Sequence, residues 1–156
     1  MAKYWDKLNP KNIGALHMRA RIASEVQEDH IEGLIIQAAL LEALLRIAIT
    51  IKVGPRRRTH KKYWDGNAKF SQLIAYYELL DGKRELIKSL DKYNIYRNKI
   101  VHSALQYPSI KALIEEARKT YNLGKEIEKK LLRVAGFKIP KNFDKPLGLR
   151  REIIEE

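Results

Sequence analysis

The chain has 156 residues, of which 45% are hydrophobic, so it can fold around a core of its own and is not disordered throughout. It contains no cysteine, which excludes disulfides, thiolate nucleophiles and thiolate-bound metals. Lys and Arg number 31 against 19 Asp and Glu, a formal net charge of +12 that favours a polyanionic partner such as RNA, DNA or an acidic membrane surface.

The N-terminal segment, residues 1–10, is a polar lead-in without the apolar core of a signal sequence. The most apolar run follows later, over residues 31–53. Polar and charged residues interrupt this run at Gln37, Glu42, Arg46 and Lys52. A membrane span of about 20 residues would not tolerate those charges, so we expect a cytoplasmic protein that does not cross a membrane.

Apolar residues recur at helical spacing in five segments that are separated by turn signals. The second helix is apolar on most sides, so we expect it to be the central, most buried one. Its N-cap comes from the break at Glu28 and Asp29. Gly124, within the fifth helix, is a candidate for a kink. The five predicted helices cover about residues 11–27, 31–52, 68–80, 83–106 and 109–135.

No segment shows the alternation of apolar and polar residues that is typical of strands. The sequence therefore predicts an all-α fold, an up-and-down bundle of four to five helices with a short C-terminal arm. We divide the chain into the lead-in over residues 1–10, the bundle over residues 11–135 and an extended C-terminal tail over residues 136–156.

A basic segment with two aromatic residues lies between the second and third predicted helices. We expect it to be an exposed loop in which cations meet phosphates and the aromatic rings stack on bases of single-stranded RNA. The alternative is a solvated surface loop without a ligand. The candidate RNA-binding residues are Arg56, Arg57, Arg58, Lys61, Lys62, Tyr63 and Trp64.

The fourth predicted helix carries an arginine on its apolar face. With about 100° per residue, Arg97 falls in the middle of a stripe of apolar residues. A guanidinium stays charged, so it needs a partner or a task in such a place. His102 lies about 140° around the helix from Arg97, on the face that holds Asn98. The apolar members of the stripe are Leu86, Ile87, Leu90, Tyr93, Val101 and Ala104.

Glu42 is the candidate partner of Arg97, because it lies close to the apolar stripe of the second helix and a carboxylate there also needs a cation. Arg46 is the alternative partner of Glu42, as an ion pair within one turn of the same helix. The sequence leaves both pairings open.

Together, Arg97, Asn98 and His102 resemble the signature of the HEPN superfamily, the higher eukaryotes and prokaryotes nucleotide-binding domains. That signature is an Arg, a polar residue and, a few residues further on, a His, all on a late helix of an all-α bundle. The resemblance covers about residues 11–135, mostly as the order and pattern of helices.

The resemblance implies a metal-independent endoribonuclease in which the motifs of two protomers line one cleft. His102 would serve as general base or acid for attack of the ribose 2′-OH on the adjacent phosphate, and Arg97 would stabilise the developing charge. Asn98 would orient the ring or the phosphate. We expect no metal and no cofactor, since the four histidines show no metal-ligand spacing.

The partners that this resemblance implies are RNA, a second copy of the chain and, for a toxin or defence component, a cognate antitoxin such as a small nucleotidyltransferase. Toxins of this kind often carry a Tyr two residues after the His as an adenylylation target, whereas this chain has Ala104 there and departs from that pattern. The alternative function is a non-catalytic basic helical module that binds RNA or another protein.

Overall fold

The computed structural model describes residues 10–54, 68–80, 82–145 and 147. Over these residues the fold is all-α, as predicted, and contains no strand. A π-helical segment, Ile22–Val26, extends the first helix, and a 3₁₀ turn, Ala104–Gln106, follows the fourth. The five α-helices are α1 (Pro10–Arg21), α2 (His30–Val53), α3 (Phe70–Leu79), α4 (Arg84–His102) and α5 (Ile110–Val134).

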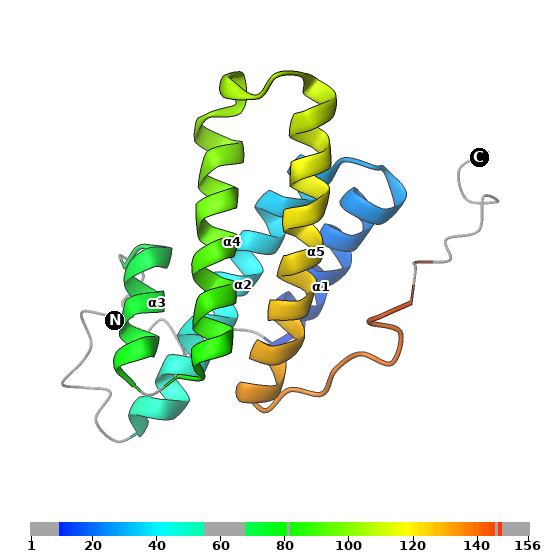
Figure 1. Cartoon of the computed structure of the whole chain (residues 1–156). Helices are drawn as coiled ribbons and strands as arrows, with labels where there is room; N and C mark the ends of the chain where they lie inside the picture. The colour runs from blue at the N-terminus through cyan, green and yellow to red at the C-terminus, as the bar shows by residue number, and fades with distance from the viewer. Residues whose placement is uncertain (1–9, 55–67, 81, 146, 148–156) are drawn as a thin grey trace, which may run out of the picture.

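Helix α2 is the centre of the bundle. It contacts α1, α3 and α5, and it runs diagonally behind the α4–α5 pair in Figure 1. Among the described helices only α2 is long and apolar enough to cross a membrane. The buried core helix of a soluble protein also meets these criteria of length and composition. Its buried apolar side chains form much of the core, and they are Leu34, Leu40, Leu41, Leu44, Leu45, Ala48, Ile49 and Val53.

Two helices begin at side-chain caps, of which the one at Asp29 was predicted. The Asp29 carboxylate accepts a hydrogen bond of 3.0 Å from the backbone N–H of Glu32 at the start of α2. The Ser109 hydroxyl accepts one of 3.1 Å from the backbone N–H of Ala112 at the start of α5. Each cap satisfies a backbone donor that would otherwise have no partner within the helix.

Helix α4 ends at His102, whereas the periodicity predicted a helix that continues to Gln106. After His102 the chain tightens into the 3₁₀ turn Ala104–Gln106, and Tyr107 is extended, as is typical of a residue before proline. The chain then reverses into α5. His102 is therefore the last residue of α4 rather than an interior one.

The buried face of α4 also differs from the predicted stripe near its end. Ile100 is buried, whereas Val101 is 43% exposed and Ala104 lies in the 3₁₀ turn. Helix α3 accompanies only the first part of α4, and the last turns of α4 lie beside α5 (Figure 1). The packing partner changes along the helix, so the side chain that enters the core changes with it.

Residues 135–145 follow α5 and return to the bundle. The ring of Phe143 is buried and stacks on His17 of α1, with 5.2 Å between the ring centroids. Arg21 of α1 donates hydrogen bonds to the backbone carbonyls of Asn142 and Lys145. The first part of the predicted C-terminal arm is thus held against α1.

Candidate active site

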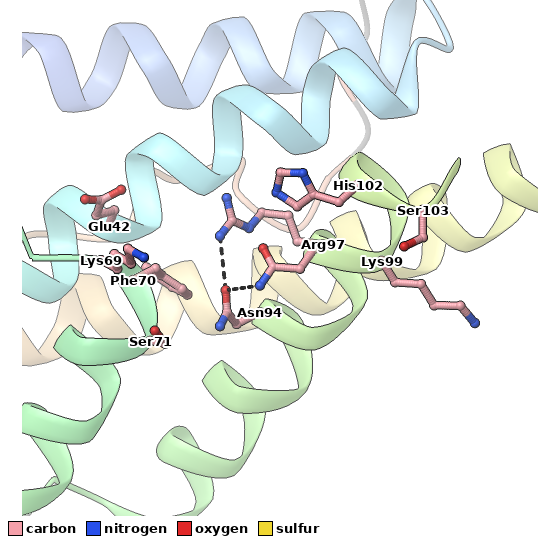
Figure 2. Close-up of a pocket in the computed structure, with 10 residues that line it drawn as sticks. Glu42, Lys69, Phe70, Ser71, Asn94, Arg97, Lys99, His102 and Ser103 are labelled. Carbon is pink, nitrogen blue, oxygen red and sulfur yellow. Dashed lines mark hydrogen bonds between the residues drawn. The ribbon is translucent and has the colours of Figure 1, made fainter. Parts of the chain in front are cut away.

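A pocket of about 690 Å³ opens between α2, the start of α3 and the C-terminal half of α4 (Figure 2). The three residues of the predicted motif, Arg97, Asn98 and His102, all line it. Glu42 of α2 lines it as well. The other lining residues are Lys69, Phe70 and Ser71 at the start of α3, and Asn94, Lys99 and Ser103 on or just after α4.

Helix geometry brings the motif residues to this pocket. Asn98 and His102 are four residues apart, so they lie one above the other on the same face of α4. Arg97 starts from a different direction, yet its side chain is long enough to reach the same space. Figure 2 shows the Arg97 guanidinium and the His102 ring extending from α4 into one pocket. A single protomer therefore gathers both groups.

The Arg97 guanidinium is held on two sides. Its Nη2 donates a hydrogen bond of 3.0 Å to Oδ1 of Asn94 (Figure 2). Its central carbon lies 5.7 Å from the centroid of the Phe70 ring, in a cation–π arrangement. Its Nε is buried and has no hydrogen-bond partner among the described residues. The Arg97 side chain also lines the pocket, so its guanidinium can bind an anion there.

Glu42 pairs with Arg46 rather than with Arg97. Its Oε1 accepts a hydrogen bond of 2.8 Å from Arg46 Nη2, which also donates to the carbonyl of Ala68. The side chain of Arg46 is 1% exposed, so this buried cation requires the carboxylate. Of the two pairings that the sequence left open, the one within α2 forms. Arg97 is left without a carboxylate partner among the described residues.

His102 is exposed at the C-terminal end of α4. Solvent can therefore reach the ring. It is not buried against aliphatic side chains, as a purely structural histidine in a bundle would be.

Asn98 is fixed by its neighbour on the same helix. Its Nδ2 donates to Oδ1 of Asn94 over 3.4 Å, a long hydrogen bond. The same oxygen accepts the hydrogen bond from Arg97. Asn98 thus presents its own carbonyl oxygen to the rest of the pocket.

The charge of the pocket is positive. Lys69, Arg97 and Lys99 line it as cations, and the carboxylate of Glu42 is already paired with Arg46. The predicted RNA-binding segment with Arg56, Arg57, Arg58, Lys61, Lys62, Tyr63 and Trp64 lies outside the described residues.

Several pocket residues were not predicted. Asn94 carried a usable signal, because it stands one turn before Asn98 on the face that the motif uses. No sequence signal marked the residues at the start of α3, since only the packing of α3 beside α4 brings them near Arg97. They are Lys69, Phe70 and Ser71.

Within the described ranges, no group of three His, Asp or Glu side chains could hold a metal ion. The pocket itself offers one imidazole and one carboxylate. Comparison of the chain with protein-family models, with curated proteins and with solved structures finds no match.

Proposed function

We propose that this protein is a metal-independent endoribonuclease that cleaves single-stranded RNA, in keeping with its resemblance to the HEPN superfamily. One observation carries the proposal: Arg97, which has no carboxylate partner among the described residues, shares an open basic pocket with the exposed imidazole of His102. A fixed cation and a titratable base in one pocket are what transesterification of a phosphodiester requires.

In the proposed reaction, His102 accepts the proton of the ribose 2′-OH, and the 2′ oxygen attacks the adjacent phosphorus. The bond from phosphorus to the 5′ oxygen breaks, and that oxygen takes up a proton. The products are a 2′,3′-cyclic phosphate and a 5′-OH. Arg97 stabilises the charge on the phosphorane oxygens, and Lys69 and Lys99 attract the flanking phosphates.

The reaction also needs a general acid for the leaving oxygen. The pocket of one protomer contains a single imidazole, which already serves as the base. A second copy of the chain supplies a second His102, which protonates the leaving oxygen. Apolar side chains next to the motif support a homodimer: Val101 is 43% exposed, Leu105 is fully exposed and Ile110 is 77% exposed. Val101 directly precedes His102 along the chain, and Leu105 and Ile110 follow it.

The alternative is a basic module that binds RNA without cutting it. The cations around the pocket and the net charge of +12 favour RNA binding in either case. The two functions differ in what His102 does. A binding module needs its cations but loses little when the imidazole is removed, whereas the nuclease loses its chemistry.

The test is cleavage of a labelled single-stranded RNA in the presence of EDTA. We expect the wild-type chain to cut it, and we expect Arg97→Ala and His102→Ala each to lower the rate by at least about 100-fold. An RNA with a single 2′-deoxyribose at the cut position should resist cleavage there, and end analysis should show the cyclic phosphate.

The matched control is Arg118→Ala. Arg118 is an exposed arginine of α5 that pairs with Glu115 and does not line the pocket. This variant should cut at the wild-type rate. Cleavage that survives both Arg97→Ala and His102→Ala would refute the assignment. RNA binding by all variants with no cutting by any would favour the binding module.

A further inference from the structure

Asn94 occupies a central position among the polar side chains of the pocket. Its Oδ1 accepts two hydrogen bonds, one of 3.0 Å from Arg97 Nη2 and one of 3.4 Å from Asn98 Nδ2 (Figure 2). It lies one helical turn before both donors and lines the pocket itself. One oxygen atom thus touches two of the three residues of the motif.

These contacts determine which way the Asn94 amide faces. A guanidinium can only donate hydrogen bonds, so the atom beside Arg97 must be the Asn94 oxygen and not its nitrogen. The same orientation requires Asn98 to donate through its nitrogen. The Asn98 carbonyl oxygen is then left as an acceptor one turn before His102, where it can take a ring N–H.

The Arg97 guanidinium is therefore oriented before any ligand binds. Asn94 holds one edge through Nη2, and the Phe70 ring covers a face at 5.7 Å. A donor group that is already in place costs no reorganisation when charge develops on a phosphate.

We infer that Asn94 is the positioning residue of this site, which aims the Arg97 guanidinium and the Asn98 amide by accepting a hydrogen bond from each. The inference rests on the proposed function for its catalytic consequence. The orientation of Arg97 can be measured without any reaction.

Two substitutions separate the roles of the Asn94 side chain. Asn94→Ala removes the acceptor, so Arg97 loses its anchor, and kcat falls roughly 10- to 100-fold with a smaller change in KM. Asn94→Asp keeps an oxygen in the same place but neutralises part of the Arg97 charge. In that variant kcat falls less than in Asn94→Ala, and KM for RNA rises because phosphates bind more weakly.

The second measurement is the mobility of the Arg97 Nε–H group by the ¹⁵N heteronuclear NOE, with the signal assigned through its loss in Arg97→Lys. The group should be ordered in the wild type and in Asn94→Asp, and mobile in Asn94→Ala. Asn122→Ala, at an exposed asparagine of α5, is the matched control and should change neither the NOE nor the kinetic constants.

The outcomes distinguish this inference from the proposed function. An Arg97 side chain that stays as ordered in Asn94→Ala as in the wild type overturns the positioning role, whether or not the protein cuts RNA. An Arg97 that becomes mobile in Asn94→Ala while no variant cuts RNA supports the positioning role and overturns the nuclease. Equal losses of kcat in the Ala and Asp variants with an unchanged NOE overturn the inference as well.

Discussion

Gln37 shows how single residues determine the packing of this bundle. Its side chain is 1% exposed, between α2 and α5. Its Nε2 donates a hydrogen bond of 2.9 Å to the Tyr121 carbonyl, and its Oε1 accepts one of 3.1 Å from the Tyr93 hydroxyl. Burial raises the pKa of Tyr93, so that hydroxyl remains a donor. Gly124 makes room for this network, because a Cβ there would lie 2.0 Å from Gln37 Oε1.

At this scale we predict opposite effects for two glycine substitutions. Gly124→Ala should lower the free energy of unfolding by about 1–3 kcal/mol, since the added methyl group displaces the buried Gln37 amide from its hydrogen bonds. Gly14→Ala, on α1 with no atom within 4 Å of the new Cβ, should raise it by about 0.5–1 kcal/mol. Urea unfolding measures both, and a stabilising Gly124→Ala would contradict the packing role.

The sequence made Gly124 a candidate for a kink in α5. The helix continues without interruption from Ile110 to Val134. The glycine allows a close approach between helices, because a Cβ there would meet the Gln37 side chain. The backbone needs no change, because the missing side chain provides the space.

At the scale of elements, ion pairs link the end of the first helical segment to α5. The Glu25 carboxylate lies 2.6 Å from Arg21 Nε and 3.2 Å from Lys125 Nζ. It also accepts a 3.3 Å hydrogen bond from the Tyr121 hydroxyl. Burial acts to raise the pKa of Glu25, but the Arg21 hydrogen bond and the Lys125 charge outweigh it, so this pKa is lowered.

A lowered pKa in the folded state means that the Glu25 carboxylate stabilises the fold above its ordinary pKa of 4.5. This contribution is lost as the pH falls from there through the folded-state pKa. We expect Glu25→Gln to destabilise the protein at pH 7 and to reduce the dependence of stability on pH below 4.5. Thermal unfolding at a series of pH values measures this.

The control for Glu25 is Glu115→Gln. The pKa of the Glu115 carboxyl is also lowered, chiefly by its hydrogen bond to Arg118, but its side chain is 48% exposed. Solvent screens such a pair, so its loss should change the pH dependence less than the loss of Glu25. Equal effects of the two substitutions would show that the ion pairs of Glu25 with Arg21 and Lys125 add nothing beyond surface charge.

At the scale of the whole molecule, the proposed homodimer has a testable surface. The turn between α4 and α5 projects from one end of the bundle (Figure 1) and carries the fully exposed Leu105. Val101 precedes it on the last turn of α4 and Ile110 begins α5, both with exposed side chains. These apolar residues lie on both sides of His102 along the chain, so a partner there would bring a second motif close to the first.

We expect Leu105→Lys to weaken self-association, because it places a charge within the proposed apolar contact. The dimer fraction should fall in sedimentation velocity, and RNA cleavage should fall with it at low protein concentration. Leu79→Lys is the matched control, since Leu79 is 77% exposed at the far end of α3 from the pocket. Equal effects of the two variants, or a wild-type chain that stays monomeric at all concentrations, would refute this surface.

The sequence by itself determined the features that depend on neighbours along the chain. Helical periodicity and the cap at Asp29 located the five helices to within a few residues, and the spacing of Asn98 and His102 placed them on one face. These signals are local, because backbone hydrogen bonds and turn geometry join residues about one turn apart. Arg97 was identified for the same reason, as a cation in an apolar pattern.

Only the tertiary structure decided the contacts between elements. It paired Glu42 with Arg46 and left Arg97 to Asn94 and Phe70. It also buried Ile100 in place of Val101. Each outcome depends on the distance and rotation between packed helices, which a periodic pattern on one helix does not contain. The pocket exists because α3 approaches α4 at that distance, and no stretch of the sequence alone encodes that approach.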